Sequence, residues 1–346
     1  MMTNDPKISV IMPIYNCELY VGEAIESILN QSFADFEFLI IDDCSTDRTL
    51  QIAQSYTDQR IKIITKEKNT GYTASLNYGI SVAKGKYIAR MDADDSSVVE
   101  RFEMQLEFLE ANPDFILCGS TVQIYGSDNI IDKPEHHNEI QIALLYGCPI
   151  AHPSVMVRKA VLEQFMYDGK MEPAEDYDLW TKMIWAGKMY NIQKPLLRYR
   201  FHEAQVSIAK SEIQQQNTAQ ARVRYFSKLD YNQNTCSPEI VLKYFQKKQL
   251  SGSEFTALLL WMTDIRKDNN RRRYFPEPAF SDFLSVAEVS LIRFYFSTHK
   301  RGGANLKLWF SLPLRYFLLV LQQHVHAAAR TLMMQLRTMM FKCLLV

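Results

Sequence analysis

The sequence lacks the cysteine and glycine patterns that mark several common classes of protein. Its six cysteines include no CxxC pair and no spacing suited to zinc, so we expect reduced core thiols in a cytosolic protein. No GxGxxG follows the first apolar run, and GxxxxGK followed by Ser or Thr occurs nowhere. These absences argue against a dinucleotide-dependent oxidoreductase and against a P-loop enzyme.

Long apolar runs and signal features are also missing. No uninterrupted apolar stretch approaches the ~20 residues that a membrane-spanning helix needs. The first ten residues, MMTNDPKISV, have neither the basic n-region nor the apolar h-region of a secretory signal. The chain does have 346 residues with 47% hydrophobic content, which is enough to bury a large core.

Acidic residues are missing from the C-terminal end of the chain. The last of them is Glu288, so residues 289–346 carry a charge of +8 and the remainder −8, although the total is zero. The final stretch combines this positive charge with Leu, Phe, Trp and Met. We predict basic amphipathic helices over residues 301–346 that contact an anionic membrane surface. The alternative is that they pack on the rest of the chain or across a homodimer.

Apolar, β-branched runs alternate with helix-period segments in the first hundred residues. Strands are predicted at 8–14, 36–41, 61–65 and 86–90. The intervening helices are predicted around 24–29, at 49–56 and at 72–85, the last with Gly85 as its C-cap. This spacing indicates an α/β fold, in which a mostly parallel sheet is covered by helices on both faces.

The alternation of strands and helices ends near residue 210. Helical patterns rich in Gln, Lys and aromatic residues follow it. We therefore predict a domain at 1–210 that holds the functional site, a helical extension at 211–300, and the basic C-terminal helices at 301–346.

Two acidic clusters are predicted at adjacent strand ends, where ligands bind in sheets of this kind. They are DDCSTD at 42–47 and MDADD at 91–95. Such clusters repel each other unless a cation lies between them, and carboxylates suit Mg²⁺ or Mn²⁺. In a strand, Asp92 and Asp94 would share one side. Asp95 would then point elsewhere, as a loop acid or a helix cap.

The acidic run MDADD has two other interpretations. Turns favour Asp, so an exposed acidic turn that caps the following helix is a common arrangement. A calcium loop fits in part, with ligand positions occupied by Asp92 and Glu103. Ser97 stands where that loop needs Gly for its sharp turn, however, and a strand rather than a helix precedes it.

A further pair of carboxylates begins an amphipathic helix in the segment AEDYDLWTKMIWAGK. Asp176 lies in the first turn of that helix, where the helix dipole favours the ionised form. An ionised carboxylate is what a general base requires at neutral pH. Acids are common at helix N-termini, so an ordinary structural role for Glu175 and Asp176 is the competing interpretation.

Four ordered motifs give the chain a specific resemblance. From about residue 7 to 210 it resembles the inverting family 2 glycosyltransferases of GT-A fold, through SVIMPIYNCELYVGEAIESILNQSF, FLIIDDCSTDRT, NTGYTASLNYGISVAKGKYIARMDADD and AEDYDLWTKMIWAGK. The segment RYRFHEAQVS is similar to a motif of the branch that builds bacterial lipooligosaccharide, O-antigen and capsule. That branch includes β-1,3-N-acetylglucosaminyltransferases.

The resemblance implies a UDP-sugar donor and a divalent cation, Mn²⁺ or Mg²⁺. The donor-binding residues that it implies are Pro13, Tyr15 and Asp43 for the uracil, Asp92 for the ribose, and Asn69 and Asn77 elsewhere near the donor. Asp94 would bind the metal that bridges the diphosphate. His202 would be a further metal ligand or a phosphate contact, unless it is a plain packed or surface histidine.

The resemblance also identifies Asp176 as the base of an inverting transfer. An acceptor hydroxyl attacks the anomeric carbon as UDP leaves from the opposite face, and the carboxylate takes the hydroxyl proton. Glu175 would orient the acceptor or the base, although it could equally face solvent. His152 would line the acceptor pocket, unless it is merely buried.

The implied function is non-processive, metal-dependent transfer of a hexose or N-acetylhexosamine to a growing bacterial surface glycan, with formation of a β-glycosidic bond. The acceptor would be a glycan or lipid-linked glycan, handled at the inner face of the plasma membrane, and no nucleic-acid partner is expected. The alternative is a non-catalytic sugar-nucleotide-binding or scaffold protein. Processive synthases add a QxxRW motif and transmembrane helices, neither of which the sequence contains.

Overall fold

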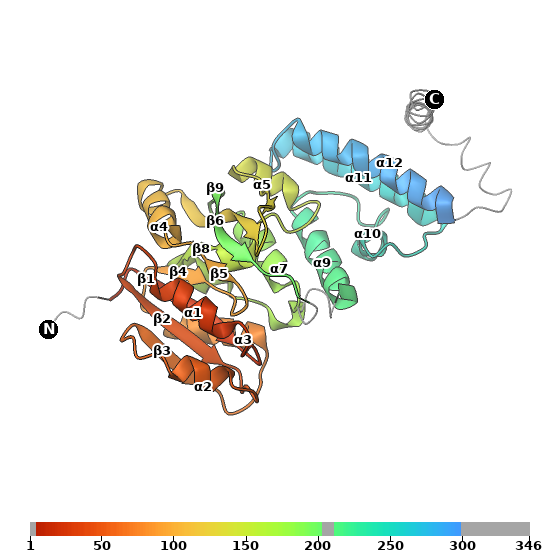
Figure 1. Ribbon diagram of the computed structural model, residues 1–346. Coiled ribbons are helices and arrows are strands. Elements are labelled where there is room, and N and C mark those ends of the chain that lie inside the picture. Colours follow the sequence, from red (N-terminus) through yellow and green to blue (C-terminus); the bar gives the residue numbers. More distant parts are fainter. Residues whose placement is uncertain (1–4, 203–210, 299–346) are drawn as a thin grey trace, which may run out of the picture. The chain divides into compact units, whose positions relative to one another are not determined.

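The structure is a computed structural model that describes residues 5–202 and 211–298 (Figure 1). The chain divides into two compact units, Met1–Lys228 and Leu229–Val346. The first unit extends beyond the boundary predicted at residue 210, because it includes helix α9 (Ser211–Phe226). The predicted basic helices at 301–346 lie outside the described residues.

Side chains of α9 explain why this helix belongs to the first unit. Gln214 donates to the carbonyl oxygen of Pro173 at 3.0 Å, and Asn217 donates to that of Glu172 at 2.9 Å. Tyr225 of the same helix is buried, and its ring centroid lies 5.4 Å from that of Trp185. The amide contacts are not visible in the sequence as an apolar pattern.

Four parallel strands form the N-terminal half of the sheet, as predicted. In spatial order they are β3 (Ile61–Thr65), β2 (Phe36–Asp42), β1 (Ile8–Ile14) and β4 (Tyr87–Arg90). In the register of β1 and β2, Ile14 lies beside Asp42. The carboxyl ends of these strands therefore reach the same edge of the sheet.

The remaining strands make the sheet mixed. They are β5 (Ser96–Ser97), β6 (Phe115–Ile124), β7 (Ile130–Ile131), β8 (Met156–Arg158) and β9 (Lys188–Tyr199). β8 is antiparallel to β4 and β6, whereas β6 and β9 are parallel. The antiparallel β5 pairs with the end of β9, so residues after Asp95 lie next to residues before His202.

Helices cover both faces of the parallel strands. They are α1 (Val21–Leu29), α2 (Thr49–Gln54), α3 (Tyr72–Val82) and α4 (Arg101–Ala111). Alternate β1 residues such as Val10 share one core cluster with Ile25 of α1. Ile11 points to the opposite face, where a Cβ on Gly79 of α3 would come within 2.6 Å of its side chain. The predicted two-sided α/β arrangement is confirmed.

Gly85 has a different role from the one predicted. The C-cap of α3 is Ala83. A Cβ on Gly85 would lie 2.4 Å from the main-chain nitrogen of Ser9, and its own N–H donates to Ser9 Oγ at 2.8 Å. The glycine is required by this close approach to β1.

The described part of the first unit also contains three short helices and two 3₁₀ turns. They are α5 (His137–Ala143), α6 (Lys159–Phe165), α7 (Glu175–Met183), η1 (His152–Ser154) and η2 (Gly169–Met171). The second unit contains α10 (Pro238–Phe245), α11 (Gly252–Arg272) and α12 (Ala279–Thr298). Among the described helices, none has the length and apolar content to cross a bilayer.

Candidate active site

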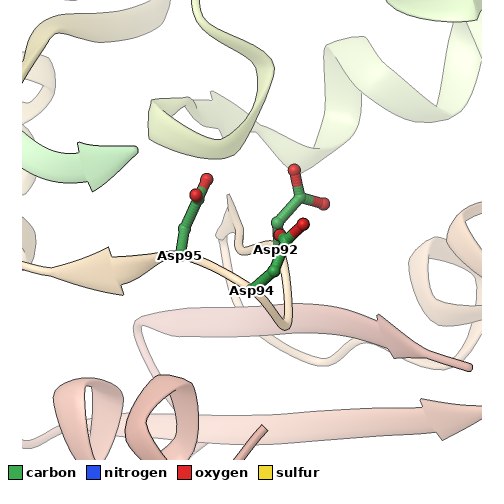
Figure 2. A group of neighbouring side chains, drawn as sticks. All are labelled: Asp92, Asp94 and Asp95. Atoms are coloured by element: carbon green, nitrogen blue, oxygen red, sulfur yellow. The ribbon is translucent and has the colours of Figure 1, made fainter. Parts of the chain in front are cut away.

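Three carboxylates gather in the turn that follows β4. Asp92, Asp94 and Asp95 offer oxygens that all lie within 4.8 Å of one another, and Figure 2 shows the side chains on one side of the turn. The segment is not a continuing strand, since the N–H of Asp95 bonds to the carbonyl of Asp92. Asp95 therefore joins the cluster instead of pointing elsewhere. It lies in the loop, as one of the two predictions has it, but it is only 1% exposed and precedes strand β5, so it is not a helix cap.

The electrostatic environment of this turn disfavours the ionised forms of Asp92 and Asp95. Burial raises the pKa of Asp92 to about 6, with an added contribution from the charge of Asp94. Burial, followed by the charges of Asp92 and Asp94, raises the pKa of Asp95 well above its usual range. Arg90 forms an ion pair with Asp92, and the hydroxyl of Tyr72 donates to it at 3.3 Å. A cation near this turn would therefore favour the ionised form of these carboxylates.

His202 lies beside this cluster, as the motif resemblance implies. Its Nε2 is 2.9 Å from Oδ2 of Asp94, and its ring centroid is 5.0 Å from that of Tyr20. The two side chains are 108 positions apart in the chain. Carboxylate oxygens and an imidazole nitrogen form a donor set that fits Mn²⁺ well, and the oxygens alone suit Mg²⁺. Asp94 and His202 are the pair best placed to hold such a cation.

The residues predicted to hold uracil lie at the ends of β1 and β2. Pro13 is buried in β1, and Tyr15 is 49% exposed just beyond it. Asp43 follows β2 directly and is buried. Its carboxylate accepts from the N–H groups of Thr70 at 3.0 Å and Gly71 at 2.8 Å.

Asp43 therefore orders the loop that carries Asn69, besides any contact with a nucleotide. Lys66 completes this arrangement, since its Nζ lies 3.1 Å from Asp43 Oδ1. Asn69 itself is exposed, and its Oδ1 accepts from the N–H of Gly71 at 3.1 Å. The structure thus places both residues at one edge of the sheet, where their roles toward a donor stay predictions.

Asn77 is used as a bridge within the protein. Its amide donates to the carbonyl of Tyr167 at 2.9 Å and accepts from the N–H of the same residue at 3.0 Å. This pairing ties α3 to the segment after α6. Any effect of Asn77 on donor binding is expected to pass through Tyr167.

Asp176 lies in the first turn of α7, as predicted. Burial raises its pKa, and hydrogen bonds from the N–H of Tyr177 and from the Cys148 thiol oppose this shift. The sulfur of Cys148 is 3.4 Å from Oδ2 of Asp176. Cys148 is an exposed residue, so the prediction of core thiols does not hold for it. The protein around its sulfur and the Asp176 charge raise the pKa of this thiol, so it stays protonated and able to donate. Sequence analysis missed Cys148, because its segment has no regular pattern and one isolated cysteine carries no signal.

Glu175 is buried, so the interpretation in which it faces solvent is wrong. It is 7% exposed, and its Oε2 has no hydrogen-bond partner among the described residues. Burial, followed by the charge of Asp176, raises the pKa of Glu175 to about 8. The side chain is therefore largely protonated at neutral pH and can donate a hydrogen bond.

This burial predicts a stability effect for Glu175→Gln. The pKa of Glu175 is about 8 in the folded state against 4.5 in the unfolded state. Between these values only the unfolded state has lost the proton, so the free energy of unfolding falls as pH rises through this window. The neutral variant escapes that loss. Its Tm at pH 8.5 should exceed that of the wild type by at least about 2 °C, the shift that 1 kcal/mol produces in a domain of this size.

Thermal unfolding at pH 4.5 supplies the comparison for this variant. There Glu175 is protonated in the folded state and partly protonated in the unfolded state, so the two proteins should differ much less. A Tm difference that does not grow between pH 4.5 and 8.5 would show that Glu175 is ionised in the folded protein.

His152 lies within an aromatic cluster. It is 8% exposed, and its Nε2 is 2.7 Å from the hydroxyl of Tyr167. Its ring centroid lies 6.3 Å from that of Tyr72 and 5.9 Å from that of Trp180 in α7. Burial lowers the pKa of His152 well below its usual range, so the imidazole is neutral. Contact with an acceptor stays a prediction for this residue.

These ring contacts connect the acidic turn to the helix that carries Asp176. Tyr72 donates to Asp92 and packs against His152, which in turn packs against Trp180. The charge of Asp176 also contributes to the raised pKa of Asp92. The carboxylates of the turn and of α7 therefore share one electrostatic environment, although they are far apart in sequence.

Comparison with known proteins agrees with this fold. Residues 9–166 match the family described as Glycosyl transferase family 2. An uncharacterized glycosyltransferase of Haemophilus influenzae is 36% identical over 222 residues, covering 60% of this chain and 69% of its own. The putative glycosyltransferase EpsE of Bacillus subtilis is 37% identical over 212 residues, covering 58% of this chain and 74% of its own.

Among solved structures, residues 1–349 of S. aureus TarS, in complex with UDP-GlcNAc, share the fold. The TM-score is 0.56 at 19% sequence identity, and the match covers 75% of this chain and 81% of the TarS chain. This likeness confirms the predicted GT-A type of sheet with its additional C-terminal helices. On the match to its relatives, the chain belongs to glycosyltransferase family 2 and is a glycosyltransferase.

Proposed function

We propose that the protein transfers a hexose or N-acetylhexosamine from a UDP-sugar to a hydroxyl group of a glycan, with inversion and with help from a divalent cation. The observation that carries this proposal is the meeting of Asp94 and His202 at 2.9 Å, in the same electrostatic environment as Asp176. In such a transfer a base takes the proton of the acceptor hydroxyl, and a cation can neutralise the charge on the leaving diphosphate.

The donor would lie along the carboxyl ends of the parallel strands. Pro13, Tyr15 and Asp43 would hold the uracil, and Asp92 the ribose. Asp94 and His202 would hold Mn²⁺ or Mg²⁺, which when bound would neutralise charge on the leaving diphosphate. The TarS structure supports this donor class, since a protein of the same fold was solved with UDP-GlcNAc.

The acceptor would approach from the side of α7. Its hydroxyl oxygen forms the new bond to the anomeric carbon as the bond to the diphosphate oxygen breaks, and Asp176 takes the hydroxyl proton. Glu175, protonated at neutral pH, can donate a hydrogen bond to an acceptor oxygen or to the base. His152 stays neutral and can line the same pocket.

A growing bacterial surface glycan is the proposed acceptor, as lipopolysaccharide, O-antigen or capsule. Support comes from the segment RYRFHEAQVS, which resembles the motif of that branch and delivers His202 to the cluster. A non-catalytic sugar-nucleotide sensor would not need both a pair of cation-binding residues, Asp94 and His202, and a base, Asp176. The presence of all three residues therefore favours the enzyme.

Release of UDP tests the proposal directly. The full-length protein should release UDP in the presence of Mn²⁺ and a glycan acceptor from one of UDP-glucose, UDP-galactose and their N-acetyl forms. Donor discrimination rests on contacts worth ~1–3 kcal/mol each, so one sugar should be preferred by roughly 10- to 200-fold. Binding of UDP without turnover of any donor would support the non-catalytic alternative.

Membrane contact by the C-terminal segment is a separate prediction. Removal of residues 305–346 should abolish binding to liposomes that contain anionic lipid, because each Lys or Arg near such a surface contributes about 1 kcal/mol. Cosedimentation with anionic and with neutral vesicles measures the effect. Unchanged binding by the truncated chain would favour packing of this segment on the protein or across a homodimer.

A further inference from the structure

Arg200 belongs to the segment RYRFHEAQVS, yet the proposed function gives it no role. It directly follows β9 and lies two residues before His202. The end of β9 is fixed on both sides. Tyr125 donates its N–H to the carbonyl of Tyr199 at 2.8 Å, and Arg198 pairs with Ser96 of β5. The main chain that leads to His202 is therefore held in place.

Arg200 contacts two consecutive residues of the acidic turn. Its main-chain N–H donates to Oδ1 of Asp95 at 2.9 Å, and its Nε donates to the carbonyl oxygen of Asp94 at 2.9 Å. The second bond fixes the peptide group of Asp94 and hence the direction in which that side chain leaves the main chain. The bond from Nε also places the positive charge of the guanidinium beside the turn.

The guanidinium group of Arg200 is itself held by three further residues. Its Nη2 lies 2.8 Å from Oε2 of Glu23 in α1. Its central carbon is 3.6 Å from the ring centroid of Tyr125 and 4.9 Å from that of Tyr20. A planar guanidinium can stack on rings and donate within its own plane at the same time, which a lysine ammonium cannot do.

From these contacts we propose that Arg200 is a positioning residue for the divalent-cation site, which holds Asp94 and His202 at a ligating separation before the cation binds. This inference rests on the metal dependence in the proposed function. The two ligands come from different elements, the turn after β4 and the end of β9. Arg200 joins those elements, so the two ligands lose less conformational freedom when the cation binds.

Binding of Mn²⁺ alone to the full-length protein tests this role. Arg200→Ala should weaken the affinity by about 10- to 100-fold, the range found when residues that orient metal ligands are removed. Arg200→Lys keeps the charge but loses the planar guanidinium group, so its Mn²⁺ affinity should lie between those of Arg200→Ala and the wild type. Arg198→Ala is the matched control. Arg198 is exposed on the same strand, and its loss should leave Mn²⁺ binding unchanged.

Turnover at increasing Mn²⁺ separates positioning from general damage to the fold. Because Arg200 acts through cation affinity, saturating Mn²⁺ should restore most of the kcat of Arg200→Ala. If that variant does not fold, Glu23→Gln removes one exposed anchor of the guanidinium. It should weaken Mn²⁺ binding by about two- to five-fold, as loss of a surface ion pair allows.

Three outcomes would count against these ideas in different ways. Equal Mn²⁺ affinity in the wild type and in Arg200→Ala would overturn the positioning role alone. A wild type that binds no Mn²⁺ would overturn the metal dependence and the positioning role together. A wild type that binds Mn²⁺ but turns over no UDP-sugar would overturn the proposed transferase reaction and leave the positioning role standing.

Discussion

Asp176→Asn is expected to lower kcat by about 10²- to 10⁴-fold, the range over which general-base catalysis contributes. The amide keeps the size of the carboxylate, and its oxygen can still accept from the N–H of Tyr177, which bonds to Asp176 at 2.6 Å. It cannot take a proton from an acceptor hydroxyl. Initial rates of UDP release at saturating donor and acceptor measure the loss.

UDP affinity provides the internal control for this variant. The nucleotide is proposed to bind at the ends of β1 and β2, so its Kd in calorimetry should change by less than about twofold. Asp114→Asn applies the same chemical change to an exposed side chain and should keep wild-type kcat. Retention of more than about a tenth of the wild-type kcat in Asp176→Asn would remove Asp176 from the role of base.

Asp94→Asn is expected to produce the second large effect, through the cation. A metal that stabilises a leaving diphosphate contributes several kcal/mol, so its loss should lower turnover at low Mn²⁺ by about 10²- to 10³-fold. The apparent Mn²⁺ affinity should fall in parallel, because Asp94 forms the closest contact with His202. Rates across a series of Mn²⁺ concentrations separate these two effects.

Chelation and a second substitution test whether the effect of Asp94→Asn arises from the cation. Excess EDTA should abolish turnover in the wild type, and added Mn²⁺ should restore it. His202→Gln should weaken Mn²⁺ binding without removing the negative charge of the turn. If EDTA leaves the wild-type rate unchanged, the acidic turn acts without a cation, and the roles proposed for Asp94 and His202 fail together.

The core of the fold could be predicted from the sequence because its strands are short apolar runs between clear turn signals. Residues 8–14 and 36–41 were predicted almost to the residue, since strands buried on both faces carry continuous apolar sequence. The contacts that join helix α9 to the first unit could not be predicted in full, because amide side chains make some of them. Such contacts leave no periodic apolar signal.

The candidate site could also be predicted only in part. The positions of Asp94 and His202 beside each other, and of Asp176 in the first turn of α7, agree with the motifs, because the resemblance covered their surroundings, whereas their roles stay predictions. The position of Asp95 within the acidic cluster could not be predicted, because the chain makes a turn where a strand was expected to continue. Cys148 and Tyr167 were missed because they lie in irregular segments, whose course is set by tertiary contacts rather than by local pattern.

Helix α3 determines how the two sides of the site can move. Tyr72 at its start donates to Asp92, while Asn77 in its middle pairs with Tyr167 and, through it, with His152. Gly79 of this helix lies so close to the sheet that a Cβ there would come within 2.6 Å of the Ile11 side chain, so the helix packs tightly on β1. α3 thus connects the acidic turn to the residues around His152. Closure around bound substrates would have to come from segments other than α3. A substitution at either end of α3 should also alter the contacts at its opposite end.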